Sequence, residues 1–250
     1  MAEIELDRIY NEDCLAGMKR IPDGSIDLVV TDAPYWHKKS PGPPYSQRRQ
    51  CNTDSKFSNS ALYNYEGEMI KQMSDFDDKC INAFLTELKP KMKIMNAYLF
   101  CSETQVPYYC MWAENNGLMF TILVWEKPLS IINKNRFSQN LEYIIRIYDY
   151  GTALNRLPYN ELYNRVKKTL PISGGNKIHP TEKPVTLMQE FIQLSSKEGD
   201  VVLDAFMGSG TTAVACIREN RHFIGFELDK GYYEKACERI RAEQMQVRLF

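Results

Sequence analysis

The sequence of 250 residues has no long hydrophobic run, since no stretch approaches the ~18 consecutive apolar residues that a membrane-spanning helix needs. The first residues, MAEIELDRIYNEDC, are too acidic and too polar to form a secretory signal. With 44% hydrophobic and 25% charged residues, the composition is typical of a globular protein with one sizeable core. We therefore expect a cytoplasmic protein that does not associate with membranes.

Paired cysteines and clustered metal ligands are also missing. The seven cysteines are scattered and form no CxxC pair, and none of the three histidines belongs to a Cys/His cluster. An odd number of scattered cysteines is typical of reduced thiols rather than of a disulfide framework. We expect no metal site in this chain.

A strong net charge is absent as well, because 31 Lys and Arg residues nearly balance 32 Asp and Glu residues. The distribution is uneven: residues 127–183 contain ten basic and four acidic residues, and residues 37–56 contain five basic residues and one acid. A basic face on a neutral protein favours a phosphate backbone as the partner, with a solvated charge cluster as the alternative. The candidates for DNA contact, chosen on charge alone, are Arg48, Arg49, Lys134, Arg136, Arg165, Lys167 and Lys168.

Short apolar segments with strand character alternate with segments of helical periodicity, as at Ile81, Phe84 and Leu88. This alternation favours a mostly parallel α/β sheet with helices on both faces. The stretch from Trp36 to about Asn64 has the composition of a long loop, and residues 151–177 are again polar and basic. The predicted strands are Arg8–Tyr10, Ile26–Val30, Ala97–Cys101, Phe120–Trp125, Tyr143–Tyr148, Val201–Leu203 and His222–Phe226.

A glycine-rich turn, Asp204-Ala-Phe-Met-Gly208-Ser-Gly210-Thr-Thr-Ala213, lies between a predicted strand and a predicted helix. It contains G-x-G-x-x-A, and Glu227 ends the next strand 19 residues after Gly208. Glycines allow close approach of the backbone to a ligand, and a carboxylate at the second strand end bonds ribose hydroxyls. The unit predicts a nucleoside-binding site, with a simple tight turn as the alternative. NAD fits less well, because its fold needs further βα units for the nicotinamide half, and the 23 residues after Glu227 leave room for one helix only.

A second motif, Thr31-Asp-Ala-Pro-Tyr-Trp36, follows the predicted strand Ile26–Val30. In open α/β sheets, ligands bind at the carboxyl ends of the strands. A carboxylate, a proline-fixed backbone and two aromatic rings at that position suit a flat polar ligand such as a nucleobase.

Together with His179-Pro-Thr-Glu-Lys-Pro184, these motifs resemble those of the S-adenosylmethionine-dependent DNA amino-methyltransferases. The family carries D/N/S-P-P-Y/F/W and F-x-G-x-G signatures, and the order found here, catalytic motif first, is that of its beta group. The resemblance implies a single domain over residues 1–250, with insertions at about 36–75 and 128–178 that recognise and contact DNA. It also implies a circularly permuted, seven-stranded Rossmann-like sheet of order 3-2-1-4-5-7-6, in which the glycine-rich unit supplies strands 1 and 2.

The resemblance assigns roles to individual residues. Asp32 and the carbonyl of Ala33 would accept hydrogen bonds from the target amine, Pro34 would fix that backbone, and Tyr35 would stack on a flipped base. Ala33 departs from the family pattern, which usually has proline there, so some rigidity is lost. The predicted cofactor-binding residues are Asp13 near the adenine, Glu227 at the ribose, Thr181, Lys183 and Asp204 near the methionine end, and Phe206, Gly208, Ser209, Gly210 and Thr211 around the pocket.

The implied activity is site-specific methyl transfer from S-adenosylmethionine to the exocyclic N6 of a flipped adenine in double-stranded DNA. Aspartate at the first motif position favours adenine; N4 of cytosine, for which serine would be typical, is the alternative. A catalytically silent nucleic-acid-binding homologue is a further alternative, although Asp32, Gly208, Gly210 and Glu227 are all present. By analogy with the family, a homodimer and a cognate restriction endonuclease are candidate partners.

Overall fold

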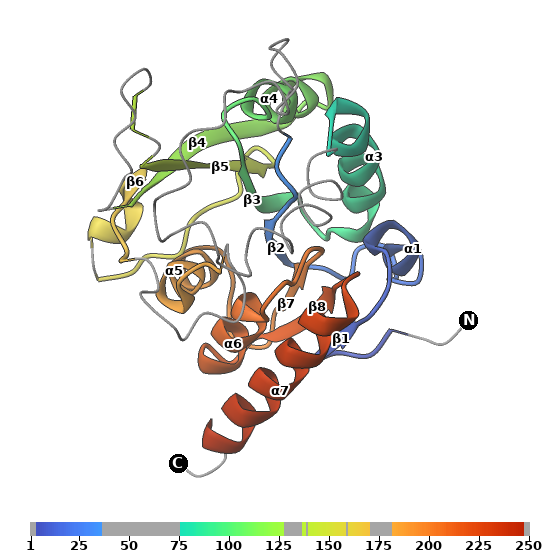
Figure 1. Cartoon of the computed structure of the whole chain (residues 1–250). Helices are drawn as coiled ribbons and strands as arrows, with labels where there is room; N and C mark the ends of the chain where they lie inside the picture. Colours follow the sequence, from blue (N-terminus) through green and yellow to red (C-terminus); the bar gives the residue numbers. More distant parts are fainter. Residues whose placement is uncertain are drawn as a thin grey trace, which may run out of the picture.

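The computed structural model describes residues 4–36, 76–127, 137–138, 140–158, 160–170 and 182–247. These residues form one eight-stranded sheet in the order β1-β8-β7-β2-β3-β5-β4-β6 (Figure 1). The strands are β1 (Arg8–Tyr10), β2 (Leu28–Asp32), β3 (Asn96–Cys101), β4 (Met119–Glu126), β5 (Leu141–Tyr148), β6 (Val166–Lys167), β7 (Val201–Asp204) and β8 (His222–Phe226).

Five neighbouring strands, β1, β8, β7, β2 and β3, run parallel, whereas β5 is antiparallel to both β3 and β4. With β7 and β8 taken as strands 1 and 2, the order reads 3-2-1-4-5-7-6, which confirms the predicted permuted sheet. One strand goes beyond the prediction. Val166 and Lys167 of β6 pair with β4 and extend the sheet to eight strands.

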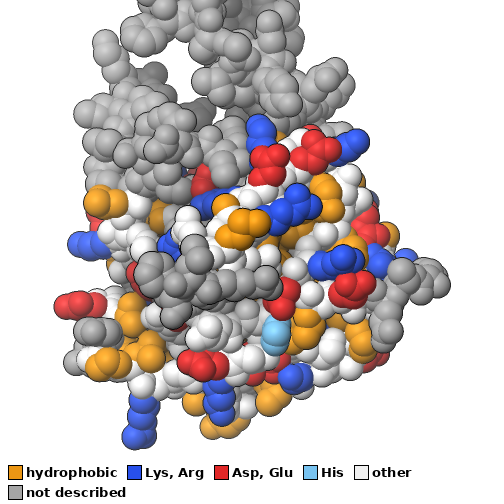
Figure 2. All heavy atoms as spheres, turned by 90° about the horizontal axis from the view of Figure 1, so that it is seen from below, with side chains coloured by type: hydrophobic (Ala, Val, Ile, Leu, Met, Phe, Trp, Pro, Cys, Tyr) orange, Lys and Arg blue, Asp and Glu red, His pale blue; other side chains and the backbone are white. Residues whose placement is uncertain are grey.

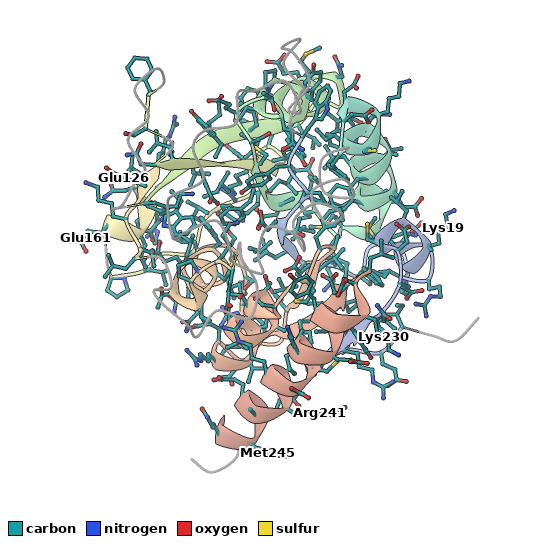
Figure 3. The ribbon with its side chains drawn as sticks, viewed as in Figure 1. Lys19, Glu126, Glu161, Lys230, Arg241 and Met245 are labelled. Carbon is teal, nitrogen blue, oxygen red and sulfur yellow. The ribbon has the colours of Figure 1, made fainter. Side chains whose placement is uncertain are left out.

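Helices cover both faces of the sheet, with α1, α3 and α4 on one face and α5, α6 and α7 on the other (Figure 1). Each set of helices closes its own hydrophobic core. In Figure 3, Glu126 and Glu161 lie near β6, whereas Lys230, Arg241 and Met245 lie along α7. The helices are α1 (Cys14–Met18), α3 (Asp78–Leu88), α4 (Val106–Asn115), α5 (Val185–Ser195), α6 (Thr211–Arg218) and α7 (Lys230–Val247), with short 3-10 turns at Lys89–Lys91 and Asn160–Tyr163.

The central strand β2 shows how the sequence builds the two cores. Val29 lies in the core under α1, α3 and α4, whereas Leu28 and Val30 lie in the core under α5, α6 and α7. All three side chains are fully buried, as expected of a parallel strand that is covered on both faces. The alternation continues to Asp32, the last residue of β2, which therefore stands on the α5 side at the carboxyl edge of the sheet.

The sequence prediction differs from the structure mainly at the ends of elements. β2 begins at Leu28 rather than at Ile26, because Ile26 forms an isolated bridge to Met92 ahead of the strand. The predicted insertion at 36–75 lies outside the described residues except for Trp36, whereas the one at 128–178 is described at 137–138, 140–158 and 160–170 and contains β5 and β6 of the sheet. The single-domain organisation stays a prediction. The six described cysteines are free, and Cys51 lies outside the described residues. No helix in the described ranges is long and apolar enough to cross a membrane.

Candidate active site

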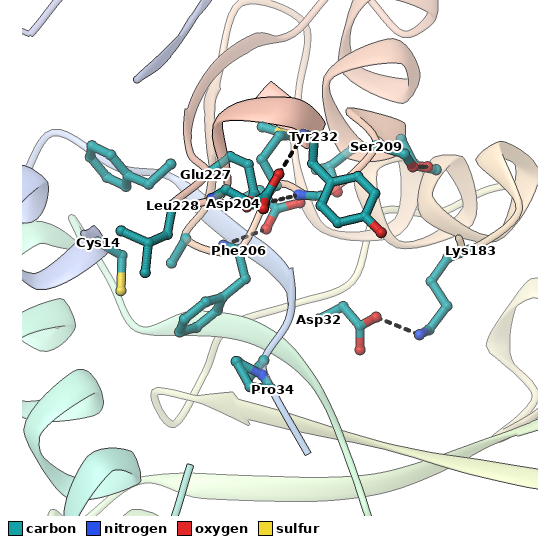
Figure 4. Close-up of a pocket in the computed structure, with 18 of the residues that line it drawn as sticks. Cys14, Asp32, Pro34, Lys183, Asp204, Phe206, Ser209, Glu227, Leu228 and Tyr232 are labelled. Carbon is teal, nitrogen blue, oxygen red and sulfur yellow. Dashed lines mark hydrogen bonds and ion pairs between the residues drawn. The ribbon is translucent and has the colours of Figure 1, made fainter. Parts of the chain in front are cut away.

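Three carboxylates stand at the carboxyl ends of adjacent parallel strands. Asp32 ends β2, Asp204 ends β7, and Glu227 directly follows β8. All three line one cavity of about 430 Å³ (Figure 4). Every predicted site residue in the described part of the chain lines this cavity except Gly210, and Thr181 lies outside the described residues. The separate sequence motifs therefore converge on one site.

The glycine-rich turn contains two glycines in the left-handed region, Gly208 with φ of 54° and Gly210 with φ of 79°. Gly210 caps α6, and a Cβ at this position would lie 3.3 Å from the Cβ of Ala236, so both conformation and space require glycine. The N–H of Gly208 donates to Glu227 Oε2 at 2.8 Å, and the N–H of Asp229 donates to Oε1 at 2.8 Å. These bonds fix the carboxylate and leave lone pairs for a ligand hydroxyl.

Asp204 holds the start of the same turn from inside the protein. Its Oδ1 accepts from Thr31 Oγ1 at 2.6 Å and from the N–H of Phe206 at 3.1 Å. Burial raises the pKa of this carboxyl to about 6, and hydrogen bonds from Thr212, Thr31 and Phe206 offset only part of the rise. Asp204 thus ties the turn to β2 at a cost in electrostatic free energy.

Arg239 of α7 fastens the turn from the other side, a role that the sequence analysis missed. Its guanidinium donates to the carbonyl of Ser209 at 3.1 Å and to Thr211 Oγ1 at 3.2 Å, and it pairs with Glu182 Oε1 at 2.7 Å. Glu182 precedes Lys183 in the chain, so one arginine joins the glycine-rich turn to the segment that carries Lys183. No sequence signal singles out Arg239, because α7 is rich in charged side chains.

Carboxylates dominate the charged part of the cavity wall. Asp13, for example, lines the cavity and also caps α1 by accepting from the N–H of Ala16 at 3.1 Å. Such a wall suits a ligand that carries positive charge and disfavours a pyrophosphate. The charged residues of the wall are Glu12, Asp13, Asp32, Glu182, Asp204, Glu227, Asp229, Lys183 and Lys230.

Asp32 is paired with Lys183, whose Nζ lies 2.5 Å from Asp32 Oδ2 and whose side chain is only 3% exposed (Figure 4). Burial raises the pKa of Asp32, although the charge of Lys183 opposes the rise. Burial alone would lower the pKa of Lys183, but Asp32 and Glu142 raise it above its ordinary value. The other carboxylate oxygen, Asp32 Oδ1, is buried and has no hydrogen-bond partner within the described part of the chain.

Glu142 completes this cluster, and the sequence analysis missed it. Its Oε2 lies 3.2 Å from Lys183 Nζ and accepts from the hydroxyl of Tyr35 at 3.1 Å, while its Oε1 pairs with Lys127 at 2.7 Å. Burial alone would raise the pKa of Glu142, but Lys183 and Lys127 hold it below its usual range. The predicted contact of Lys183 with a cofactor stays a prediction, whereas its contacts with Asp32 and Glu142 are additions from the structure.

The backbone after Asp32 is clamped by the connection between β3 and α4. The buried Gln105 donates from Nε2 to the carbonyl of Pro34 at 2.9 Å, and Thr104 Oγ1 donates to the carbonyl of Trp36 at 2.8 Å. Ala33, between these points and Asp32, is itself buried. Tertiary contacts therefore supply part of the rigidity that proline would give at position 33.

The basic candidates for DNA contact differ in their accessibility. Lys167 is not available for contact with DNA, because its side chain is 2% exposed and its Nζ pairs with Glu190 at 3.1 Å. Arg165 and Lys168 are exposed. On the face shown in Figure 2, basic and acidic side chains are interspersed. The other candidates, Arg48, Arg49, Lys134 and Arg136, lie outside the described residues.

Comparisons with known proteins bear on this site. Residues 26–238 match the sequence model of a family described as DNA methylase. The type II methyltransferase M.HpaI of Haemophilus parainfluenzae is 26% identical over 257 residues, which cover 94% of this chain and 74% of that protein. The M1.HpyAVI–SAM complex superposes with a TM-score of 0.65 at 25% identity, covering 93% of this chain and 98% of the other. The cytosine-N4-specific PvuII DNA methyltransferase has a TM-score of 0.69 and covers 98% of this chain and 93% of its own, but at 17% identity it bears on the fold alone.

Proposed function

Since the chain belongs to the DNA methylase family of amino-methyltransferases, we propose that it transfers a methyl group from S-adenosylmethionine to N6 of adenine in double-stranded DNA. The observation that carries the proposal is the buried Oδ1 of Asp32. This acceptor has no partner within the described part of the chain, and its residue lines the same cavity as the glycine-rich turn. Aspartate at the first position of the catalytic motif supports adenine over cytosine.

The cavity residues fit S-adenosylmethionine as the cofactor. The carboxylate-rich wall suits a ligand with a sulfonium and an ammonium group. Glu227, whose carboxylate is fixed by backbone N–H groups, would hold the ribose hydroxyls, with Asp13 near the adenine and Asp204 near the methionine end. When bound, S-adenosylmethionine supplies an electrophilic methyl group on sulfur.

Asp32 prepares the amine of the target base for attack. The exocyclic amine is a weak nucleophile because its lone pair is delocalised into the ring, and positive charge builds on its nitrogen during attack. Asp32 Oδ1 accepts a hydrogen bond from this amine, and the carbonyl of Ala33 accepts a second, so both stabilise the developing charge. Lys183, 2.5 Å from Oδ2, favours the ionised form of the partly buried Asp32. The rest of the rate enhancement comes from alignment of the amine.

The target base must leave the duplex to reach Asp32, which costs a few kcal/mol of unpairing and unstacking. Tyr35 lines the cavity and offsets part of this cost by stacking on the base. Its hydroxyl donates to Glu142 at 3.1 Å, which restricts the orientation of the ring. Arg165 and Lys168, both exposed, are the described basic residues that remain candidates for contact with the DNA backbone.

Methyl transfer from labelled S-adenosylmethionine to a diverse library of duplex DNA tests the proposal. The wild-type protein should label the DNA, and Asp32→Ala should not. Asp78→Ala, which removes an exposed acid from the first turn of α3, should label as the wild type does. Retained binding of S-adenosylmethionine by Asp32→Ala would show that this variant folds. A wild-type protein that binds the cofactor but labels no DNA would favour the catalytically silent alternative.

The same labelled product identifies the base. Nucleoside analysis separates N6-methyladenine from N4-methylcytosine, and sequencing of the methylated positions gives the recognition site. Recovery of N4-methylcytosine would overturn the adenine assignment and leave the methyltransferase activity in place.

A further inference from the structure

A row of alternating charges leads from Asp32 away from the cavity. Lys183 Nζ lies 2.5 Å from Asp32 Oδ2 and 3.2 Å from Glu142 Oε2, and Lys127 Nζ lies 2.7 Å from Glu142 Oε1. Each charge therefore has an opposite charge as its neighbour. Asp32 and Lys183 line the cavity, whereas Glu142 and Lys127 stand behind its wall.

The topology of the sheet brings Glu142 to this position. Because β5 is antiparallel to β3, its first residues lie where β3 ends, and Cys101 at the end of β3 pairs with Tyr143. Glu142 shares a sheet face with Ile144, which belongs to the core under α5. Lys183 precedes Pro184, the N-cap of α5, so it approaches the sheet from that face. A shift of one residue in the β5 register would turn Glu142 to the other face.

Glu142 also holds the aromatic ring of the catalytic motif. Its Oε2 accepts from the hydroxyl of Tyr35 at 3.1 Å, and the same oxygen lies 3.2 Å from Lys183 Nζ. Lys183 Nζ in turn lies 5.6 Å from the centre of the Tyr35 ring. One carboxylate oxygen thus sets the relative positions of the ring proposed to stack on the base and the lysine that neutralises Asp32.

We infer that Glu142 is a positioning residue for methyl transfer, acting through Lys183 and Tyr35 to hold Asp32 and the base-stacking ring in one fixed arrangement. The inference rests on the proposed function. Stability alone gives little reason for the arrangement, because replacing buried ion pairs with well-packed apolar side chains is often neutral or stabilising. Glu142 is not among the residues that line the cavity, so its effect should appear in the rate and not in cofactor binding.

Steady-state kinetics of Glu142→Gln test the inference. Glutamine keeps the shape and an acceptor for Tyr35 but removes the charge that faces Lys183. We expect kcat to fall about 10- to 100-fold, as for a small misplacement of reacting groups, while KM for S-adenosylmethionine stays close to the wild-type value. Glu126→Gln is the matched control, since Glu126 lies on the neighbouring strand near β6, 3.7 Å from Lys168, and should keep the wild-type kcat (Figure 3).

A double-mutant cycle with Lys183→Met separates positioning from general damage to the fold. If Glu142 acts through Lys183, the loss of kcat caused by Glu142→Gln should shrink strongly in the Lys183→Met background. If Glu142→Gln fails to bind S-adenosylmethionine, Lys127→Met serves as the test variant instead. Lys127→Met should also lower kcat and leave KM for S-adenosylmethionine unchanged.

Three outcomes would overturn the inference: a wild-type kcat for Glu142→Gln, equal losses in both backgrounds of the cycle, or a wild-type kcat for Lys127→Met where that variant replaces Glu142→Gln. A wild-type protein that methylates no DNA would instead overturn the proposed function, so the two failures are distinguishable.

Discussion

Asp204 allows a quantitative test of how the glycine-rich turn is held. The side chain is 4% exposed, and burial raises the pKa of its carboxyl from 3.8 to about 6. Because the folded-state pKa is the higher one, the contribution of Asp204 to stability is fully present below pH 3.8 and is lost as the pH rises through 6. At 1.36 kcal/mol per pKa unit, the loss on reaching neutral pH amounts to about 3 kcal/mol.

The substitution Asp204→Asn removes this titration while it keeps the shape of the side chain. The asparagine Oδ1 can still accept from Thr31 and Phe206, and its Nδ2 can donate to the hydroxyl of Thr212. The free energy of unfolding of the variant, taken relative to the wild type, should therefore increase by about 2 kcal/mol between pH 4.5 and pH 8. The remaining part of the effect falls below pH 4.5.

Urea unfolding of the cofactor-free protein at several pH values measures this difference, because all other ionisable groups are common to the two proteins. Thr31→Val is a companion variant. It removes a hydrogen bond that favours the ionised form of Asp204, so the stability of that variant should fall more steeply with rising pH. A difference between Asp204→Asn and wild type that stays constant from pH 4.5 to pH 8 would refute the reasoning.

Three further substitutions test other contacts of the site. Lys183→Met removes the charge that opposes the effect of burial, so the pKa of Asp32 rises and the acid limb of the kcat–pH profile should move to higher pH; an unchanged profile would contradict this. Gly210→Ala should lower the free energy of unfolding in urea by about 1 to 2 kcal/mol, because φ is 79° and the new Cβ meets Ala236 at 3.3 Å; a neutral effect would argue against the tight turn. Arg239→Met releases the glycine-rich turn and should raise KM for S-adenosylmethionine more than it lowers kcat, and an unaltered KM would count against that role.

Local sequence patterns located most elements but not all of their ends. β8 spans the predicted residues His222–Phe226, whereas β2 is displaced by two residues towards Asp32. Hydrophobicity reports burial, and Ile26 is buried without belonging to the strand, while strand ends depend on pairing with neighbours. The order of the strands came from the resemblance to a known family, since periodicity alone does not order strands in a sheet.

The three carboxylates at the strand ends of the cavity carry local signals in the sequence. Asp32, Asp204 and Glu227 each follow an apolar strand, and the glycines between them mark a turn. Glu142 and Gln105 carry no such signal, because their roles depend on contacts between distant segments: the bond from Tyr35 to Glu142 spans 107 positions, and the bond from Gln105 to the Pro34 carbonyl spans 71. Only the packed sheet brings these partners together.

The row of charges from Asp32 to Lys127 offsets two opposed effects of burial on the proposed chemistry. Burial strengthens the proposed hydrogen bond from the amine to Asp32, but the same burial raises the pKa of that carboxyl. Lys183 counters this rise and, being 3% exposed, itself needs the carboxylate of Glu142. Glu142 pairs with Lys127, whose side chain is 27% exposed, so the compensation ends where water solvates the last charge. A parallel β5 would place Glu142 at the opposite edge of the sheet, so the antiparallel strand is what brings this carboxylate to Lys183.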